Sequence, residues 1–393
     1  MELKIYISAQ LQSKRRVCLL PAIAILLSIA SCTADNKSIK HVSLVGAGAS
    51  FPAPLYERWL SDYNQQNPNV EINYQAIGSS AGVQQLIEGT VDFAASDVGI
   101  TNEQAAKIKK GVIALPMTAG SIVLAYNLAP TRQSPQVNLP NGLKLSRQVY
   151  VDIFLGKITN WNNPRIAVAN PGVNLPNLPI QVVHRTDGSG TTSVLTQHLS
   201  TISLEWKSQV AAGKAVAWPV GIGGKGNEGV TALIQQIPGA IGYVEYIYAK
   251  QNKLPMAALE NKFGNYITPT PESVAQTLES VKLPADNLIA FINDPTGSQA
   301  YPIVTYSWLL TYQQYPNRVK GKALKKFIDW ALIEGQKSSL ELGYIPLSKK
   351  VVLQVQSAAN KNCRITKSVD AIKANWRRLS FVLCQGFNAV YVF

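Results

Sequence analysis

The feature that most constrains the fold of this chain is a pattern that recurs four times along it. A short apolar run typical of a strand ends in small and hydroxyl residues, and a helical pattern begins soon afterwards. These four loops lie at residues 48–51, 78–80, 95–97 and 185–191. Strands that alternate with helices in this way predict an α/β fold. A chain of 393 residues has room for two domains at ~150 residues each.

The pattern of apolar residues also predicts where the individual elements lie. We expect strands at residues 42–45, 70–76, 91–95, 112–117, 122–126, 180–184, 240–244 and 303–308. We expect helices from Pro54 to about residue 67, at about 81–89, from 191 to about 199, at 319–334 and at 348–358. Proline and asparagine gather at residues 136–141 and 162–177, which we expect to be loops.

Cysteine content and charge narrow the class of ligand. The four cysteines are Cys18, Cys32, Cys363 and Cys384, so residues 33–362 can form neither a disulfide nor a thiolate metal site. The net charge is +14, of which +3 lies in residues 1–31 and +5 in residues 361–393. The remaining +6 includes no long basic run, which disfavours nucleic acid and suits a small anionic ligand.

The first 31 residues resemble a bacterial lipoprotein signal. Basic residues 14–16 precede an apolar stretch of about 14 residues, which is shorter than the ~20 that span a bilayer. Small residues then precede Cys32, which such a signal would leave lipidated at the mature N-terminus, with residues 32–40 as a tether. The alternatives are an ordinary signal peptide or an N-terminal membrane anchor. Each alternative places the chain outside the cytoplasm or at the membrane.

The four loops have a composition that suits an anion. A helix N-terminus has unpaired N–H groups and a positive dipole end, and serine or threonine adds neutral donors. In an open α/β sheet, ligands bind beyond the carboxyl ends of the strands, where such loops lie. Each loop alone could be only a turn or a helix cap. Four of them in one chain favour a binding site.

The loop at residues 185–191 is the most informative. Arg185 can bind an oxyanion through two parallel hydrogen bonds, and Asp187 can hold the guanidinium in place. Glycines let the backbone approach closely, while Ser189 and Thr191 add hydroxyl groups. No P-loop sequence is present, which disfavours nucleotide binding.

Six stretches together resemble the substrate-binding proteins of bacterial ABC-type phosphate transporters. They are GAGASFPAP at 46–54, GSSAG at 78–82, VDFAASD at 91–97, RTDGSGT at 185–191, GGKGN at 223–227 and PGAIGYVEY at 238–246. The resemblance runs from about residue 42 to 358. It implies a two-lobed α/β protein of the type II periplasmic-binding-protein fold, in which each lobe is a sheet flanked by helices. Lobe 1 would be residues 41–117 plus 301–360, lobe 2 residues 118–300, and the ligand would lie in the cleft.

The same resemblance implies the residues of the site. The implied phosphate contacts are Ser50, Phe51 through its backbone N–H, Ser79, Asp97, Arg185, Asp187, Ser189, Gly190 and Thr191. The family usually has threonine where this chain has Ser50, so a hydroxyl donor is kept. It further implies a monomer without cofactor or metal that binds inorganic phosphate outside the cytoplasmic membrane. The closed protein would dock on the transporter's permease subunits, so the resemblance implies a binding protein and not an enzyme.

Asp97 gives the implied site its selectivity, because phosphate at neutral pH still carries a proton that a carboxylate can accept. Sulfate has no such proton, and it would face Asp97 with like charge and an unpaired group. Alternatively, Asp97 only caps the following helix, in competition with Thr101 and Asn102.

Three questions stay open in the sequence. The ligand could be another tetrahedral oxyanion, or the chain could be a phosphate-ester hydrolase that uses Ser189 with His184 as base. We expect His184 to point away from that site. Residues 361–393 depart from the family pattern, and whether Cys363 and Cys384 pair is open.

Overall fold

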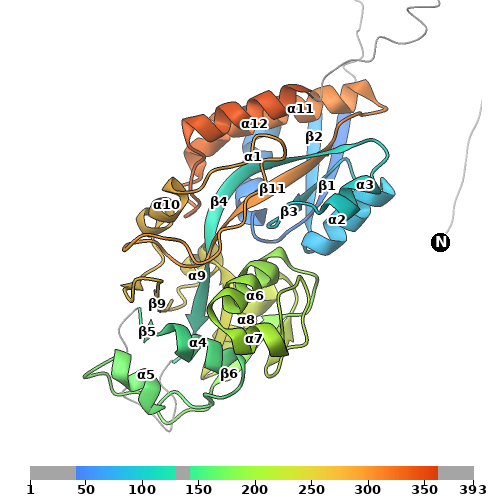
Figure 1. The fold of residues 1–393 in the computed structure, drawn as a ribbon. Coiled ribbons are helices and arrows are strands. Elements are labelled where there is room, and N and C mark those ends of the chain that lie inside the picture. The colour runs from blue at the N-terminus through green and yellow to red at the C-terminus, as the bar shows by residue number, and fades with distance from the viewer. Residues whose placement is uncertain (1–40, 129–141, 362–393) are drawn as a thin grey trace, which may run out of the picture. The chain divides into compact units, whose positions relative to one another are not determined.

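An eight-stranded sheet runs through the part of the chain that the computed structural model describes, residues 41–128 and 142–361 (Figure 1). Its strand order is β2-β1-β3-β11-β4-β8-β6-β7. The strands are β1 (Val42–Gly48), β2 (Val70–Ala76), β3 (Phe93–Ser96), β4 (Val112–Tyr126), β6 (Gln181–Arg185), β7 (Ile222–Gly224), β8 (Ala240–Glu245) and β11 (Val304–Tyr312). A small sheet has the order β10-β9-β5, with β5 (Lys144–Leu145), β9 (Ala258–Glu260) and β10 (Tyr266–Ile267).

Strand β4 joins two groups of strands. Its residues 112–121 pair antiparallel with β11, and its residues 122–126 pair antiparallel with β8. The first group is completed by β3, which pairs antiparallel with β11, and by β1 and β2, which pair in parallel. The second is completed by β6 and β7, which also pair in parallel. In Figure 1, β4 is the long strand that passes from the group with α1 to the group with α6.

The prediction of two separate strands at 112–117 and 122–126 was wrong. The small and polar residues between them, such as Thr118 and Gly120, look like a break in the sequence, yet they are buried and paired with β11. The ladder continues through them with one shift of register, between Ser307 and Trp308 of β11. One continuous strand therefore links the two groups.

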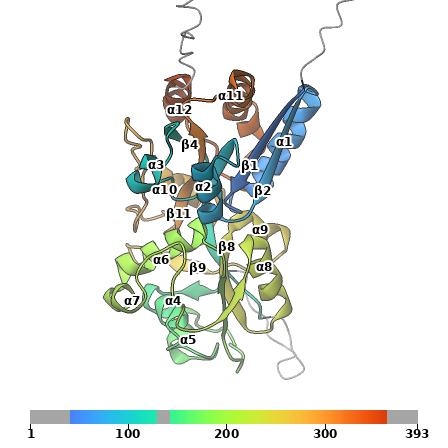
Figure 2. The same ribbon diagram turned by 90° about the vertical axis from the view of Figure 1, so that its right-hand side faces the viewer.

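The helices cover the sheet on its two faces. They are α1 (Ala53–Gln66), α2 (Ser79–Glu88), α3 (Asn102–Ala106), α4 (Arg147–Phe154), α5 (Pro164–Ala169), α6 (Gly190–Ile202), α7 (Leu204–Gln209), α8 (Gly226–Gln236), α9 (Tyr246–Gln251), α10 (Pro271–Glu279), α11 (Arg318–Ile333) and α12 (Lys349–Lys361). A short 3-10 helix, η1, spans Gly335–Ser338. Helix α2 packs on β1 and β3, while α6 and α8 lie to either side of β8 (Figure 2). No helix within the described ranges is both long and apolar enough to span a membrane.

Most of the expected helices and strands are present within a few residues of the predicted bounds. One described exception is residues 162–177, expected to be a loop, which include α5. Asn163 caps this helix by accepting a hydrogen bond from the Arg165 N–H, and Pro164 occupies its first turn. The predicted loop at 136–141 lies outside the described residues.

The order of elements places the four small-residue loops at one level of the sheet. β1 and β3 are parallel neighbours, so the loops that follow their carboxyl ends lie next to each other. β6 is parallel to β8 in the second strand group and leads into α6 through residues 186–189. The fold therefore brings together loops that are up to about 140 positions apart in the chain.

Candidate functional site

Direct hydrogen bonds join the four loops into one cluster. The Ala49 N–H, in the first loop, donates to the Ala95 carbonyl in the third at 3.0 Å. The Gly190 N–H, at the start of α6, donates to Ser79 Oγ at 3.1 Å. The Ser80 N–H donates to the Gly188 carbonyl at 2.9 Å. The Thr191 hydroxyl donates to Asp97 Oδ2 at 3.4 Å. The sequence-predicted site residues therefore lie in one place, and they come from both strand groups.

The loop after β1 presents polar backbone and side-chain groups in a buried position. Ser50 is 1% exposed, and its carbonyl accepts a hydrogen bond from the Tyr248 hydroxyl at 2.7 Å. The Phe51 carbonyl accepts one from the Tyr344 hydroxyl at 2.6 Å. Close packing of this loop on β3 requires Gly48, which has φ of +149° and whose Cβ would lie 2.2 Å from the Ala95 carbonyl oxygen.

Asp97 is a buried carboxylate held by hydroxyl donors. It is 1% exposed; Oδ1 accepts from the Ser307 hydroxyl at 2.9 Å, and its carbonyl accepts from the Thr305 hydroxyl at 2.9 Å. Burial raises its pKa from 3.8 to about 7, against the opposing effects of the Ser307 hydrogen bond and the Arg185 charge. The helix that follows, α3, is capped by Thr101 in a capping box with Gln104. Asp97 is therefore not the cap of this helix.

Arg185 and Asp187 form a bidentate ion pair at the end of β6. Arg185 is 4% exposed; its Nε donates to Asp187 Oδ1 at 2.7 Å and its Nη2 to Oδ2 at 2.5 Å. Burial works against the charge of each partner, but their mutual attraction outweighs it, raising the Arg185 pKa and lowering that of Asp187. Arg185 Nη1 also donates to the Thr191 hydroxyl at 3.4 Å, so Thr191 connects the guanidinium to Asp97. The cluster thus combines a fixed cation and a fixed acceptor.

Ser189 works as a helix cap and has no imidazole partner. Its Oγ accepts a hydrogen bond from the Thr192 N–H at 3.1 Å, and its own N–H donates to the Lys214 carbonyl at 2.8 Å. His184 stacks on Trp218, with ring centroids 5.1 Å apart. His198 bonds the Tyr150 hydroxyl at 2.9 Å. The pair of Ser189 and His184 that a hydrolase would need is therefore not formed.

Two residues near the cluster were not predicted from the sequence. Lys214 follows α7, and its positive charge lowers the Asp97 pKa. Burial in turn lowers the pKa of Lys214, and the attraction of Asp97 partly opposes this effect. The Lys214 backbone is tied to Ser189, which explains why its side chain lies near the cluster. Asn227 contacts Ser50 and belongs to the stretch at 223–227, which was noted only as part of the resemblance. No local signal marks Lys214, because only the tertiary fold places it here.

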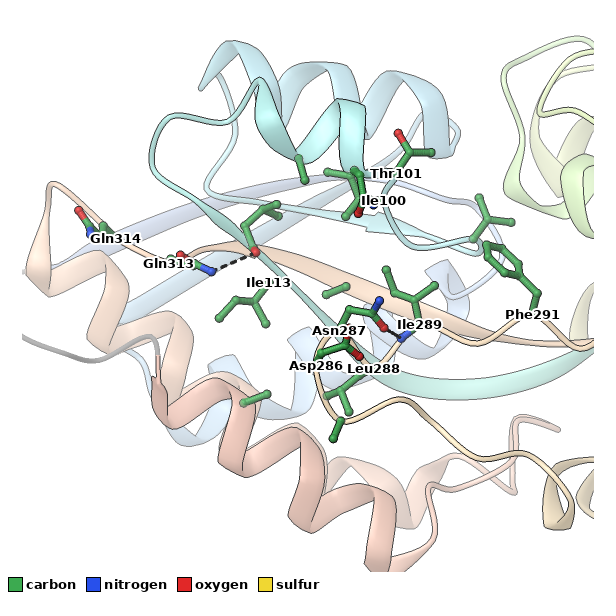
Figure 3. A pocket seen from close by; sticks show the side chains of 17 residues that line it. Ile100, Thr101, Ile113, Asp286, Asn287, Leu288, Ile289, Phe291, Gln313 and Gln314 are labelled. Carbon is green, nitrogen blue, oxygen red and sulfur yellow. Dashed lines mark hydrogen bonds between the residues drawn. The ribbon is translucent and has the colours of Figure 1, made fainter.

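A separate cavity of about 940 Å³ lies beside α3 and α12 (Figure 3). Ile100, Ile113 and Phe291 are among the residues that line it, and so is the acidic Asp286. None of the predicted site residues lines it, and its described lining residues include no lysine or arginine. This cavity is therefore a poor site for an anion.

Some of the predictions fall on parts of the chain that the structure does not describe. Cys32, the tether at residues 32–40 and the tail from residue 362 lie outside the described residues. Within the described ranges, no group of three or more histidine, cysteine or acidic side chains is arranged to hold a metal ion.

Comparisons with known proteins agree on one family. The model of the PBP superfamily domain matches residues 31–334. The "Phosphate-binding protein PstS" of Pasteurella multocida (strain Pm70) is 42% identical over 336 residues, which cover 85% of this chain and 93% of that protein. The protein of the same name from Haemophilus influenzae (strain ATCC 51907 / DSM 11121 / KW20 / Rd) is 42% identical over 316 residues, covering 80% of this chain and 92% of that one.

Solved structures are similar in fold at lower sequence identity. The phosphate-binding protein from Stenotrophomonas maltophilia has a TM-score of 0.62 at 20% identity, over 80% of this chain and 93% of that one. The periplasmic phosphate-binding protein PfluDING, solved with bound phosphate, has a TM-score of 0.64 at 16% identity, with the same coverage of the two chains. The prediction of a type II periplasmic-binding-protein fold is confirmed by these neighbours.

Proposed function

The chain belongs to the PstS family of phosphate-binding proteins, and on this premise we propose that it captures inorganic phosphate and delivers it to an ABC-type phosphate importer. One feature of the site carries the proposal. A buried guanidinium, that of Arg185, and a buried carboxylate, that of Asp97, face the same cluster and are connected through Thr191. A ligand that fits both must accept hydrogen bonds and also donate one, as a protonated oxyanion does.

The proposed contacts are those that the family resemblance implied. Ser50, Ser79, Ser189 and Thr191 would supply hydroxyl groups. The N–H groups of Phe51 and Gly190 and the guanidinium of Arg185 would supply further donors, with Asp187 holding the guanidinium. Asp97 would accept the phosphate proton. Among the described residues, none accepts a hydrogen bond from the Phe51 N–H, which supports a role for it in binding the ligand.

Selectivity against sulfate follows from Asp97. A site built around a hydrogen bond to one ligand rejects a near-isostere that lacks the bonding atom by about 10⁴–10⁵. Sulfate is fully ionised at neutral pH, so it would leave Asp97 unpaired and next to a like charge. The carboxylate is held by Ser307 and cannot easily turn away.

We propose that the two strand groups are the cores of two lobes, residues 41–117 plus 301–360 and residues 118–300. The chain would cross between them in β4 and again just before β11. Hydrogen bonds between the two sets, such as those of Ser80 with Gly188 and of Ser79 with Gly190, support a closed arrangement. Phosphate would favour closure because only the closed state lets both sets of donors reach it.

The proposed location is outside the cytoplasmic membrane, on a lipid anchor at Cys32, with the protein acting as a monomer. The order of basic, apolar and small residues before Cys32 supports this. Cys32→Ser should release the protein from the membrane fraction into the soluble fraction of the exported proteins. Continued membrane association of that variant would exclude the lipid anchor.

The competing proposal is a binding protein for another tetrahedral oxyanion. Equilibrium dialysis of phosphate-stripped protein with labelled phosphate, in competition with sulfate and arsenate, distinguishes the two. We expect arsenate to compete, because it carries a proton at neutral pH, and sulfate to fail even at a thousandfold excess. Effective competition by sulfate would favour the alternative ligand.

A further inference from the structure

Asn227 is fully buried, and one orientation of its side-chain amide gives each of its polar atoms a hydrogen-bond partner. Its backbone N–H and its side-chain Nδ2 both donate to Ser50 Oγ, at 3.1 and 2.9 Å. Its Oδ1 accepts from the Glu245 N–H at 3.0 Å, and its carbonyl accepts from the Thr231 hydroxyl at 2.8 Å. Because the Glu245 N–H can only donate, it must face Oδ1, and the amide nitrogen must therefore face Ser50.

These two bonds define what the Ser50 hydroxyl can still do. A serine hydroxyl has one proton to donate and two lone pairs that accept. Asn227 occupies both lone pairs, since two N–H groups converge on Ser50 Oγ. Only the proton remains available to a ligand. An oxyanion can only accept hydrogen bonds at its ionised oxygens, so this state of Ser50 is matched to an oxyanion.

We propose that Asn227 is a positioning residue for phosphate recognition, which fixes the Ser50 hydroxyl as a donor and does so only in the closed protein. The inference rests on the proposed function. Ser50 follows β1 in the first strand group, whereas Asn227 lies in α8, which packs on β8 and β6 of the second. Opening the two groups would separate Asn227 from Ser50 and leave its hydroxyl free to rotate. The orientation of the Ser50 hydroxyl and the closure of the two strand groups are thus linked through the side-chain amide of Asn227.

The local fold supports this placement of Asn227. Gly226 has φ of +69°, and its N–H donates to Asp187 Oδ1 at 3.0 Å, one position before the Asn227 N–H donates to Ser50. The first turn of α8 therefore contacts both the Arg185–Asp187 pair and Ser50. Asn227 acts on the ligand through Ser50, so its effect must depend on the Ser50 hydroxyl.

A double-mutant cycle between the two residues tests this dependence. Asn227→Ala and Asn227→Asp are each made alone and in the Ser50→Ala background, and phosphate dissociation constants are measured by calorimetry. We expect each Asn227 substitution to weaken binding about five- to tenfold more when Ser50 is present than when it is replaced. Repulsion between phosphate and the new charge of Asn227→Asp acts in both backgrounds and cancels in the comparison. That variant keeps the acceptor for Glu245, so it covers the case in which Asn227→Ala fails to fold.

Asn170→Ala is the matched control in both backgrounds. Asn170 is also buried, and its Nδ2 donates to two backbone carbonyls, those of Lys144 and Ile166, away from the site. We expect it to lower the melting temperature and leave phosphate affinity unchanged. Equal losses from Asn227 substitution in the two backgrounds would mean a merely structural role and would overturn the inference. Absence of phosphate binding by the wild-type protein would instead refute the proposed function itself.

Discussion

Replacing Asp97 by asparagine should make the ligand-free protein more stable at alkaline pH, at the cost of ligand selectivity. Asparagine is nearly isosteric and keeps an acceptor for the Ser307 hydroxyl, which bonds Asp97 Oδ1 at 2.9 Å. It removes the need to hold a charge in a position that is 1% exposed. The substitution therefore isolates the energetic cost of the carboxylate from the packing around it.

The size of the effect follows from the pKa. The Asp97 pKa rises from 3.8 to about 7 on burial. At ~1.36 kcal/mol for each pKa unit, keeping this group ionised in the folded protein costs up to about 4 kcal/mol at pH 8. We expect Asp97→Asn to recover about half or more of this free energy. For a protein of this size, such a gain raises the melting temperature by roughly 3–8 °C.

The effect of Asp97 ionisation on the stability of the folded protein depends on pH. Well below its unfolded pKa of 3.8, Asp97 is protonated in both the folded and the unfolded chain, and its ionisation has no effect on stability. As the pH rises from about 4 to 7, the unfolded chain loses the proton first, so the folded state loses stability relative to it. The gain from Asp97→Asn should therefore be small at pH 4 and complete at pH 8.

Thermal unfolding in phosphate-free buffer at pH 4, 6 and 8 measures this gain directly. Asp286→Asn, which changes an exposed aspartate outside the cluster, is the control and should change little at any pH. An equal gain for Asp97→Asn at pH 4 and pH 8, or none at pH 8, would refute the reasoning that burial of the Asp97 charge is costly.

Three other substitutions probe separate parts of the site. Arg185→Lys loses the bidentate geometry and should weaken phosphate binding about 10- to 100-fold by calorimetry, whereas unchanged affinity would mean that charge alone suffices. Lys214→Met should slow phosphate association several-fold at low salt and little at high salt in stopped-flow measurements; a salt-independent effect would contradict electrostatic attraction by this lysine. Gly48→Ala should cost about 2 kcal/mol or more in urea unfolding, because its Cβ would meet the Ala95 carbonyl, and wild-type stability would show that the loop can shift.

The local pattern of the sequence predicts about half of the elements, including the longest strands and helices, because strand and helix periodicity and capping residues are local signals. It fails where long-range pairing overrides local composition. Ala119 and Gly120 are poor strand residues, but pairing with β11 makes β4 continuous through them. In the sequence, Asp97 and Thr101 are both candidate caps of α3. Only the folded turn shows that Thr101 caps this helix, through its capping box.

The part of the site that the sequence missed depends on tertiary contacts. Lys214 is brought beside Asp97 by a backbone bond to Ser189, and nothing around it in the sequence resembles a binding loop. The bond between Asn227 and Ser50 joins residues 177 positions apart. Composition predicted an anion site and the family resemblance predicted its residues, whereas the orientation of each donor needed the folded chain.

A crystal structure of the phosphate-bound protein is the most direct measurement of how the ligand is held. We predict one phosphate within hydrogen-bond distance of both Asp97 and Arg185, with Ser50 and Ser79 on one side of it and Gly190 on the other. Phosphate held by the loops of only one strand group, or bound without contact to Asp97, would contradict capture between two lobes.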